Sequence, residues 1–368
     1  MAKILFISNK DNNFYNFRSE KILKFKELGH EIVLLCPYGK KFDYFTERDC
    51  RFIDLNIDRR GTNPFKDLIL IKNYIKIIKQ EKPDIVLTYT TKSSIYGGIA
   101  CRLTKTPYVV NNAGLIESNN YSWYIGVVLN MLYRIGFGGA SCMMYQNHQE
   151  RDFVQALLHN KVYYRDIPGS GVNLEDFVFK PYPSHEEKII FNFVARIVGF
   201  KGIEEYLICA EAIKQDYPNV EFRIFGDYDD EEYRKRINDL DSKGIVRYMG
   251  VQMNMRPFIE ECHAAIHPSY YEGMTNVVLE HSASGRPCIG SDISGVKEGI
   301  EDGKTGFICK VKNSGSLIMV VRKFLNLSYK EKAVMGITAR EKMEREFDRN
   351  IVTNIYIEEI NRILNKEK

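Results

Sequence analysis

Apolar strand-like runs alternate with amphipathic helical segments along the chain, and the whole scheme occurs twice. The first half opens with a strand, a helix and a strand, over residues 3–8, 17–29 and 30–37. The second half opens in the same way, over residues 188–196, 202–218 and 220–226. Strand–helix alternation of this kind predicts a parallel, doubly wound sheet with helices on both faces. Because 368 residues are many for one core, two Rossmann-like domains facing each other are expected.

A segment rich in Pro, Gly, Ser and charged residues, at positions 168–188, separates the two halves. This composition is typical of a connection between domains. The predicted domains therefore cover residues 1–175 and 176–348. Ligands of doubly wound sheets bind beyond the carboxyl ends of the strands, so the cleft between the two sheets is the expected site.

Charge is distributed unevenly between the halves. Residues 1–170 contain 24 Lys and Arg against 16 Asp and Glu, whereas residues 171–368 contain 28 against 32. A basic N-terminal half could bind an anionic membrane surface or a phosphorylated ligand. Equally, the lysines could serve only to keep the surface helices soluble. Nucleic acid is not expected as a partner, because no basic run is interleaved with aromatic residues.

The eight cysteines are scattered, and no two of them form a C-x-x-C pair. This pattern argues against a zinc site and against a disulfide framework. No signal peptide precedes the first strand, so reduced thiols in the cytoplasm are expected.

The segment YSWYIGVVLNMLYRIGFGG, residues 121–139, is apolar for nearly the length of a membrane span. It contains Asn130 and Arg134, and a central arginine is costly in hydrocarbon. We therefore expect a buried or interfacial helix and not a transmembrane one. An interfacial helix would agree with the basic N-terminal half.

Two cations follow the strand that opens the second half. Arg196 comes directly after it, and Lys201 precedes the glycine that begins the next helix. Cations at the carboxyl end of a strand, beside a helix N-terminus, can hold a phosphate, Arg through two hydrogen bonds and Lys as a point charge. Taken alone, the two would be read as solvated loop residues.

A second helix N-terminus lies in EGMTNVVLEHSASG, residues 272–285. Thr275 or Asn276 suits the N-cap position, so the free N–H groups of the first turn would suit a phosphate. Glu272 would repel that phosphate, and we expect it to accept a hydrogen bond from a sugar hydroxyl. Glu280 would accept from a ribose diol, as an acid does in dinucleotide folds. The alternative for Glu280 is an exposed helix face, although the residues before it are apolar.

The two features together resemble family 4 of the retaining nucleotide-sugar glycosyltransferases. The resemblance rests on the E-x7-E spacing at 272–280 with Arg and Lys upstream in ARIVGFKG, residues 195–202. It extends over nearly the whole chain. Three further segments are similar to a subgroup that builds bacterial surface glycans, often on a polyprenyl-diphosphate carrier: NFYNFR at 13–18, NPF at 63–65 and TKSSIYG at 91–97.

The resemblance implies the GT-B fold, in which two Rossmann-like domains, each with a doubly wound parallel sheet, face each other across a cleft. The N-terminal domain would lie on the acceptor side, and the C-terminal domain would bind the nucleotide sugar. Residues 349–368 would form a helix that packs back on the N-terminal domain.

The resemblance also implies a role for each matching position on the donor side. Arg196 and Lys201 would neutralise the departing diphosphate, while Glu272 would face the transferred sugar. Glu280 would hold the ribose. Backbone N–H groups for the sugar and the phosphate would come from Gly273, Met274, Thr275 and Asn276. The base would meet the backbone of Val251 near Gly226.

On the acceptor side, a loop over Asn12–Arg18 would close over the diphosphate or meet the acceptor. The residues expected there or elsewhere in the cleft are Asn16, Arg18, Lys92 and Asn147. The chain departs from the family pattern at Met274 and Thr275, in the first loop, and at NNAGLIES, residues 111–118, where a family histidine has no counterpart. These departures leave the donor sugar, the acceptor and the linkage open.

The implied reaction moves a hexose or N-acetylhexosamine from a nucleotide sugar, expected to be UDP-linked, to a glycan or glycolipid acceptor. The anomeric configuration is kept, and no second carboxylate is placed as a nucleophile. A front-face displacement is therefore favoured, in which the departing diphosphate accepts the acceptor's proton. We expect no metal or other cofactor, and a location at the inner face of the cell membrane.

Rival interpretations remain at this point. Asp227-x-Asp229 matches the metal-binding pair of the other glycosyltransferase fold, although a cap of the following helix by Asp229 or Asp230 is the better interpretation, and Arg196 and Lys201 would make a metal redundant. A nucleotide-sugar epimerase of the same fold, or a binding protein without catalysis, would share the donor residues. A NAD-dependent oxidoreductase is disfavoured, since no G-x-G-x-x-G follows the first strand. His267 and His281 flank the donor motif and are expected to be structural.

Overall fold

The computed structural model describes residues 1–58, 61, 63–111, 123–184 and 188–366. The chain divides into two compact units, residues 1–170 with 350–368, and residues 171–349. The boundaries predicted from the sequence lie at 175/176 and 348/349. The structure divides the chain five residues earlier at the first boundary, at 170/171, and one residue later at the second, at 349/350. Each unit is an α/β domain with a parallel sheet, which confirms the fold class predicted from the strand–helix alternation.

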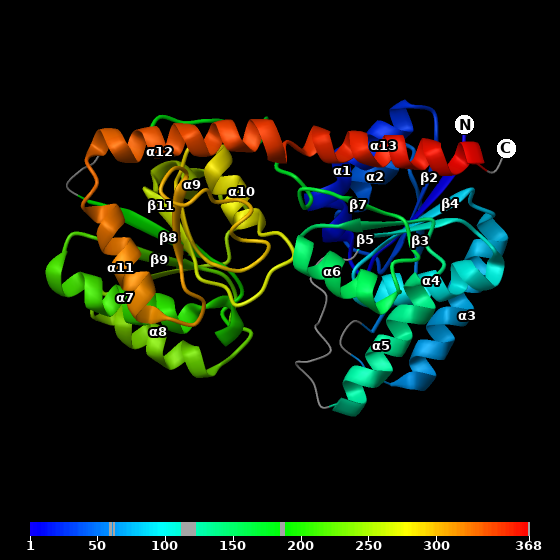
Figure 1. Ribbon diagram of the computed structural model, residues 1–368, viewed down its shortest axis with the longest axis horizontal. Helices are drawn as coiled ribbons and strands as arrows, with labels where there is room; N and C mark the ends of the chain where they lie inside the picture. Colours follow the sequence, from blue (N-terminus) through cyan, green and yellow to red (C-terminus); the bar gives the residue numbers. More distant parts are fainter. Residues whose placement is uncertain (59–60, 62, 112–122, 185–187, 367–368) are drawn as a thin grey trace. The chain divides into compact units, whose positions relative to one another are not determined.

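The described residues of the first unit build a seven-stranded parallel sheet in the order β3-β2-β1-β4-β5-β6-β7 (Figure 1). Its strands are β1 (Lys3–Ile7), β2 (Glu31–Cys36), β3 (Arg51–Asp54), β4 (Ile85–Tyr89), β5 (Tyr108–Asn111), β6 (Cys142–Tyr145) and β7 (Tyr164–Asp166). Its helices are α1 (Asp11–Glu27), α2 (Asp43–Thr46), α3 (Pro64–Glu81), α4 (Thr91–Thr104), α5 (Trp123–Phe137), α6 (His148–Leu157) and α13 (Arg349–Lys366).

The strands of this sheet are buried on both faces, so alternate residues of one strand enter two separate cores. In β1, Leu5 and Ile7 face the core under α3, α4, α5 and α6. Ile4 and Phe6 face the core under α1, α2 and α13. The C-terminal helix contributes an apolar stripe to this second core through Val352, Tyr356, Ile360 and Ile363. Helix α13 therefore packs on the N-terminal sheet, although the whole second unit, residues 171–349, lies between the two in the sequence.

Helix α1 begins at Asp11, earlier than the predicted start at Phe17. The expected loop over Asn12–Arg18 is therefore wrong, because these residues form the first turns of the helix. The cause is a long-range contact: Phe14 is fully buried and lies edge-on to Phe6 and to Tyr89, with ring centroids 6.4 Å apart in both pairs. Asp11 in the first turn also suits the positive end of the helix dipole.

The described residues of the second unit build a six-stranded parallel sheet in the order β10-β9-β8-β11-β12-β13. Its strands are β8 (Ile190–Val194), β9 (Glu221–Phe225), β10 (Arg247–Gly250), β11 (Ala264–His267), β12 (Cys288–Ser291) and β13 (Gly306–Cys309). Its helices are α7 (Ile203–Asp216), α8 (Glu232–Ser242), α9 (Arg256–Glu261), α10 (Asn276–Ala283), α11 (Ser314–Leu325) and α12 (Tyr329–Lys342).

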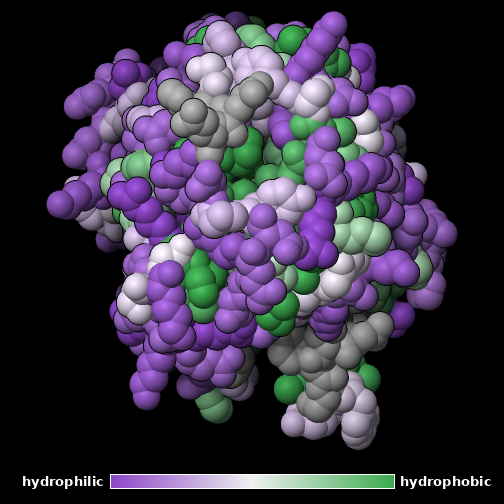
Figure 2. Space-filling view, turned by 90° about the vertical axis from the view of Figure 1, so that its left-hand side faces the viewer, coloured by the Kyte–Doolittle hydropathy of each residue, from purple (hydrophilic) through white to green (hydrophobic). Residues whose placement is uncertain are grey.

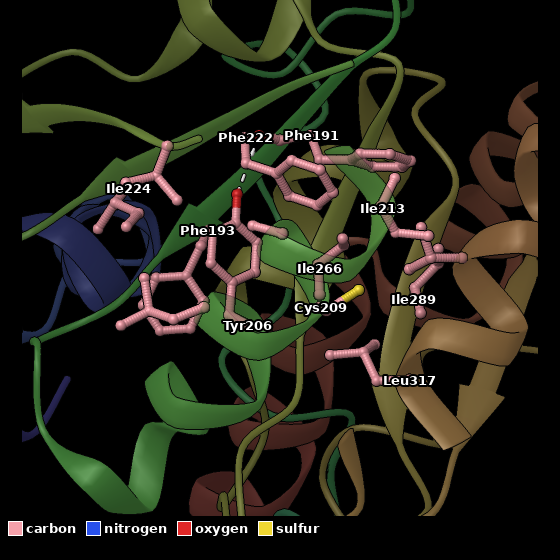
Figure 3. Packing of buried hydrophobic residues seen from close by; sticks show 14 of the residues in the cluster. Phe191, Phe193, Tyr206, Cys209, Ile213, Phe222, Ile224, Ile266, Ile289 and Leu317 are labelled. Carbon is pink, nitrogen blue, oxygen red and sulfur yellow. Dashed lines mark hydrogen bonds between the residues drawn. The ribbon is translucent and has the colours of Figure 1, made fainter. Parts of the chain in front are cut away.

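Helix α7 is fixed on this sheet by the aromatic core shown in Figure 3. Tyr206 is fully buried among Phe193, Phe222 and their neighbours. Its hydroxyl donates to the backbone oxygens of Phe191 and Arg223, at 3.3 and 2.9 Å. A buried tyrosine whose hydroxyl is satisfied fixes both the depth and the rotation of its helix. The N-terminus of α7, which follows Lys201, is thereby held at the carboxyl edge of the sheet.

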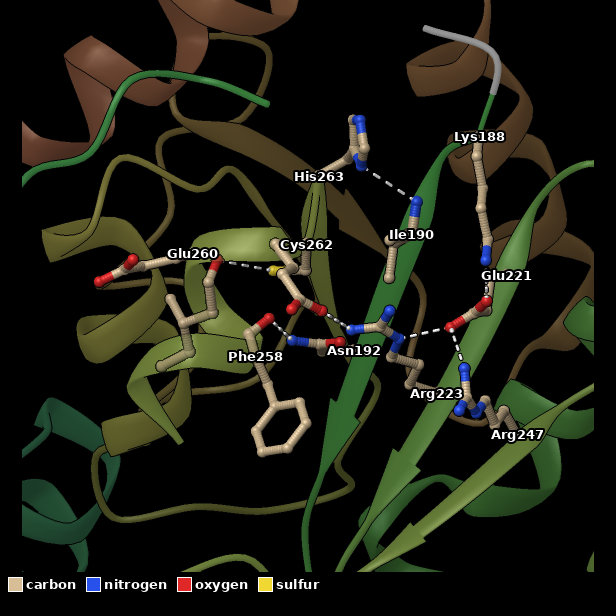
Figure 4. Close-up of polar contacts among 12 residues, drawn as sticks. Lys188, Ile190, Asn192, Glu221, Arg223, Arg247, Phe258, Glu260, Cys262 and His263 are labelled. Carbon is tan, nitrogen blue, oxygen red and sulfur yellow. Dashed lines mark hydrogen bonds and ion pairs between the residues drawn. The ribbon is translucent and has the colours of Figure 1, made fainter. Parts of the chain in front are cut away.

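Charged side chains at the amino ends of the strands form a separate network (Figure 4). Glu221 pairs with Lys188 and Arg223, both at 2.5 Å, and Arg223 also reaches Glu261 at 2.7 Å. Burial alone would raise the pKa of Glu221, but the two cations outweigh it and hold that pKa below its usual range. These charges neutralise one another at the edge opposite the carboxyl ends.

Candidate functional site

The strand order of the second unit reverses between β8 and β11. In an open parallel sheet, the loops that leave two such strands diverge and form a crevice outside their carboxyl ends. Here the first loop carries Arg196 and Lys201, and the second carries residues 268–275 before α10. The two segments that the sequence singled out thus leave adjacent strands at the same edge of one sheet.

Three side chains from these loops meet at one carboxylate. Lys201 Nζ lies 2.5 Å from Glu272 Oε1, and His267 Nε2 lies 2.9 Å from the same oxygen. A carboxylate only accepts, so His267 carries its proton on Nε2. Thr275 Oγ1 lies 3.2 Å from that nitrogen. His267 is buried at the end of β11, while Lys201 and Glu272 are partly exposed.

The surroundings of Glu272 set its charge. Burial alone would raise its pKa, but the hydrogen bond from His267 and the charge of Lys201 lower the pKa to about 2. Glu272 is therefore an anion at every physiological pH. A fixed carboxylate at a sheet edge can accept hydrogen bonds from a neutral, hydroxyl-rich ligand.

Two glycines allow the loops to approach each other this closely. Gly202 has φ of +77°, and a Cβ there would lie 2.1 Å from the backbone oxygen of Pro268. Gly295 has φ of +85°, and a Cβ there would lie 2.4 Å from the oxygen of Gly273. Only glycine fits both constraints. Gly202 thus brings Lys201 to Glu272, and Gly295 supports the Glu272–Gly273 backbone from behind.

Helix α10 begins at Asn276 with Thr275 as its N-cap, as the sequence predicts. The Thr275 hydroxyl makes no capping bond, because it lies against His267 instead. The first N–H groups of the helix have no partner within an α-helix. Gly273 and Thr275 are buried, whereas Met274 and Asn276 are partly exposed. The N–H of Thr275 donates to the oxygen of Gly295 at 3.0 Å, so the prediction that it serves a ligand is wrong, and the ligand donors at this helix start would be the N–H groups from Asn276 onward.

Glu280 lies one turn further along α10 and is partly buried. Burial raises its pKa to about 7, and Arg349 lowers it by less. Glu280 is therefore half protonated near neutral pH. Burial without a hydrogen-bonding partner destabilises the ionised form of Glu280. Hydroxyl groups of a ligand could donate to this carboxylate and so stabilise its ionised form.

Arg196 is half-exposed and lies 2.6 Å from Asp229 Oδ2. Its guanidinium also stands over the ring of Phe200, which stacks on Tyr271. Asp230 Oδ1 accepts from the N–H of Glu232, the first residue of α8, at 3.3 Å, although the N-cap position belongs to Glu231, whose side chain makes no capping bond. Within the described ranges, no group of three His, Cys, Asp or Glu side chains is arranged to hold a metal ion.

The remaining predicted donor residues lie at the ends of β9 and β10. Gly226 has φ of +142°, and a Cβ there would collide with the oxygen of Ala195 at 1.8 Å. Its N–H donates to Gly250, and Tyr248 donates to its oxygen. Val251 follows β10 and is exposed. Both positions therefore lie at the same carboxyl edge as the Lys201–Glu272–His267 cluster.

A pocket of about 530 Å³ lies at the amino ends of β8 and β9, away from this edge. Figure 2 shows the corresponding side as largely hydrophilic, with hydrophobic residues visible inside a hollow. None of the predicted site residues lines the pocket. Its walls come from residues including Tyr182, Ile189, Tyr217, Leu327 and Tyr329.

Comparison with known families decides the identity. The model described as "Glycosyl transferases group 1" matches residues 175–342, which include the whole cluster. The model described as "Glycosyl transferase 4-like" matches residues 3–147. The protein is a GT-B glycosyltransferase of family 4. The family resemblance predicted from E-x7-E and its upstream cations is confirmed.

Relatives of this glycosyltransferase include enzymes of bacterial glycan assembly. It is 25% identical to the N,N'-diacetylbacillosaminyl-diphospho-undecaprenol α-1,3-N-acetylgalactosaminyltransferase of Campylobacter jejuni, over 98% of this chain and 99% of that one. It is 24% identical to the UDP-Gal:α-D-GlcNAc-diphosphoundecaprenol α-1,3-galactosyltransferase of Escherichia coli, over 78% of each chain.

Solved structures share its fold. A glycosyltransferase from Rickettsia africae superposes with a TM-score of 0.77 at 19% identity, over 99% of this chain and 98% of that one. HepE from Anabaena, solved with UDP and glucose, gives a TM-score of 0.77 at 17% identity, over 98% and 100%. These likenesses support the GT-B fold of the glycosyltransferase.

The four acceptor-side candidates of the glycosyltransferase lie on or beside helices α1, α4 and α6 of the first unit. Arg18 is buried, donates to the oxygen of Asn13 at 2.7 Å and stands over Tyr89. Lys92 pairs with Asp67 at 2.7 Å. Asn147 caps α6, accepting from the N–H of Glu150 at 2.8 Å, and Asn16 is exposed on α1. The histidine-lacking segment at 112–118 lies outside the described residues.

Sequence reasoning missed three functional elements of the glycosyltransferase site. His267 was expected to be structural, yet it donates to Glu272. Its position as the last residue of a strand, five before the glutamate, was the available signal. Gly202 and Gly295 were missed because the need for each glycine comes from a backbone contact in another loop.

Proposed function

We propose that this glycosyltransferase moves a hexose or N-acetylhexosamine from a UDP-sugar to a polyprenyl-diphosphate-linked saccharide, with retention of configuration. The observation that carries the proposal is the Lys201–Glu272–His267 cluster at the start of α10. It combines a cation, a fixed anion and a helix N-terminus, which match a diphosphate and a sugar held side by side.

The charges divide between the two parts of the donor. The positive start of α10, with Lys201 and the nearby Arg196, suits the diphosphate as it gains negative charge on leaving. Stabilising that leaving group by about 4 kcal/mol accelerates the reaction about a thousandfold. Glu272 remains ionised and suits hydroxyls of the transferred sugar, while Glu280 suits the ribose.

Retention through a front-face displacement is part of the proposal. The acceptor hydroxyl would attack from the side that the diphosphate leaves, and a departing phosphate oxygen would take its proton. Glu272 is poorly suited to act as a base, because Lys201 and His267 hold its pKa at about 2. The carboxylate would instead stabilise positive charge that develops on the sugar ring.

The relatives support the choice of substrates. The printed name of the E. coli relative contains UDP-Gal, and HepE was solved with UDP. Both relatives described above are named for acceptors on diphosphoundecaprenol. A polyprenyl-linked acceptor would place the reaction at the cytoplasmic face of the membrane. We further propose that no metal is required, because Arg196, Lys201 and the α10 N-terminus would supply the positive charge.

The test is a transfer assay with the purified protein. UDP-, GDP- and ADP-sugars are each offered with polyprenyl-diphosphate saccharides, with and without EDTA, and the products are read by mass and by the anomeric coupling in NMR. Transfer from a UDP-sugar with retained configuration, unaffected by EDTA, is expected. An inverted product would contradict the mechanism, and isomerised donor without any acceptor would favour an epimerase.

A further inference from the structure

Helix α5 of the first unit turns large apolar side chains outward. Trp123, Val127 and Met131 are exposed to 81%, 60% and 52%. At 100° per residue, they share one face of the helix with three more exposed residues. We call this set the α5 face; its members are Trp123, Tyr124, Val127, Val128, Met131 and Ile135.

The opposite side of α5 is fixed on its neighbour, so the α5 face cannot turn inward. Gly136 of α5 and Gly98 of α4 sit where the helices cross. A Cβ on Gly98 would lie 2.1 Å from the oxygen of Gly136, and a Cβ on Gly136 would lie 2.7 Å from the oxygen of Ile95. Tyr133 and Phe137 on the same side are fully buried. An ordinary surface helix buries its apolar face and exposes its polar one, whereas α5 is apolar on its exposed side as well as on its buried side.

The neighbouring helices extend this surface and add positive charge. Helix α4 contacts both α3 and α5, and the three cover one face of the sheet (Figure 1). The first turns of α3 expose Phe65, Leu68 and Ile69. The exposed cations on the three helices are Lys66, Lys72, Lys76, Lys79, Arg102, Lys105 and Arg134. Helix α5 itself contains no acidic residue.

The size and pattern of the surface indicate its partner. Contiguous apolar patches are uncommon on monomeric proteins and mark places of contact. Within the part of the chain that the structure describes, no helix has the length and apolarity needed to cross a bilayer. An exposed apolar helix face with aromatic residues and flanking cations is instead typical of a helix that lies in the headgroup region of an anionic membrane.

We propose that the α5 face, with the exposed residues of α3 and α4 beside it, inserts into the interface of an anionic lipid bilayer. This inference rests on the proposed function to the extent that a polyprenyl-linked acceptor lies in that membrane. A second copy of the chain is the less suitable occupant. A two-fold contact would bring the same cations of both copies together without counter-charge.

Trp123 is the only tryptophan of the chain and therefore reports directly on the α5 face. Vesicles of phosphatidylglycerol and phosphatidylethanolamine are added to the whole protein, and tryptophan emission and flotation are measured. A blue shift, quenching by brominated lipid, and flotation that falls as salt rises are expected. Pure phosphatidylcholine vesicles should bind at least about tenfold less, since they lack the anionic charge. Unchanged emission with the anionic vesicles would overturn the proposal.

A double variant separates the α5 face from general stickiness. V127E/M131E should lower the fraction of protein that floats at least about tenfold, because insertion would bring two new carboxylates into the apolar part of the interface. The matched control M319E/V334E changes exposed Met and Val residues on α11 and α12 and should float like the wild type. Equal flotation of both variants would contradict the assignment. A wild-type dimer in size-exclusion chromatography that V127E/M131E converts to a monomer, with flotation unchanged, would assign the face to a second copy.

Activity distinguishes this inference from the proposed function. With a short-chain, water-soluble acceptor, V127E/M131E should keep the wild-type rate, while its rate on acceptor in vesicles should fall about tenfold or more. If no polyprenyl-linked acceptor is used at all, the proposed function fails, but loss of flotation in V127E/M131E would still support the membrane face. If transfer occurs and flotation does not, the membrane face fails alone.

Discussion

The two sheets reverse their strand order in the same way, between β1 and β4 in one unit and between β8 and β11 in the other, yet their carboxyl edges differ in chemistry. At β8/β11, side chains from both loops converge on Glu272. At β1/β4, Asn13 of α1 donates to Ser8, and Arg18 of the same helix stands over the ring of Tyr89 at the end of β4. The topology provides two crevices, and the residues at and after the strand ends give the second one a carboxylate shared by a lysine and a histidine.

The two edges also store strain differently. In the second unit, the positive φ angles at this edge belong to glycines, including Gly202, Gly226 and Gly295, which adopt them at little cost. In the first unit, the residue that joins β4 to α4 is Thr90, with φ of +71°. A β-branched residue in that region is strained. The β8/β11 edge thus allows its two loops to approach closely, whereas the β1/β4 edge holds Thr90 in a conformation that a β-branched residue disfavours.

The largest effect is expected from removing the cation of the cluster. Lys201→Ala should lower turnover about a thousandfold and also cost about 1–3 kcal/mol of stability, because Glu272, whose pKa His267 and Lys201 hold at about 2, loses one partner of its charge. Steady-state kinetics and calorimetry measure the two quantities. Lys188→Ala, which removes a paired lysine from the amino edge of the same sheet, is the matched control and should keep full turnover. A folded Lys201→Ala enzyme of normal rate would remove Lys201 from the mechanism.

A smaller effect is expected from separating the two loops. Gly202→Ala would place a Cβ 2.1 Å from the oxygen of Pro268 at φ of +77°, so the loop must move away from Glu272. We expect about 3 kcal/mol of lost stability and about a hundredfold lower turnover. Gly244→Ala also has positive φ but meets nothing within 4 Å, so it should cost only about 1 kcal/mol and no activity. Equal effects of both substitutions would show that contact at Pro268 is unimportant.

Glu280 offers a pH-dependent comparison within the second unit. Its pKa of about 7 in the folded chain exceeds the ordinary value of 4.5, so the folded state holds its proton more tightly. Stability therefore falls as pH rises from about 4.5 through 7. Glu280→Gln should raise stability by about 1–3 kcal/mol at pH 8 and much less at pH 5, measured by denaturant titration.

The same variant should bind the UDP-sugar about tenfold more weakly at pH 8, because Gln is a poorer acceptor for the ribose than a carboxylate. Calorimetric titration measures that affinity. At pH 6, where Glu280 is mostly protonated, the two proteins should converge. The exposed Glu341→Gln on α12 is the control and should change neither quantity. A stability gain that is independent of pH would show that Glu280 ionises normally.

Local patterns in the sequence predicted the scaffold and one half of the site. The alternation predicted both sheets, and the Thr275–Asn276 pair predicted the start of α10. The pairing of Lys201 with Glu272 could not be predicted, since it joins loops that leave different strands. The early start of α1 was not predicted for a related reason. Its first residues are rich in Asn and locally indicate a loop, and the contacts of Phe14 with Phe6 and Tyr89 place them in the helix instead. Contacts between distant segments decided both cases.

The smallest predicted effect tests the strain at the first edge. Thr90→Gly should raise stability by about 0.5–1 kcal/mol, because glycine adopts φ of +71° without the clash of a β-branched side chain. Thr91→Gly, one residue later in α4, has the opposite expectation and should cost about 1 kcal/mol. Thermal unfolding of the pair gives the sign directly. If Thr90→Gly is destabilising, the threonine side chain stabilises the fold by more than its backbone strain costs. The two edges would then differ in their charged side chains and not in strain.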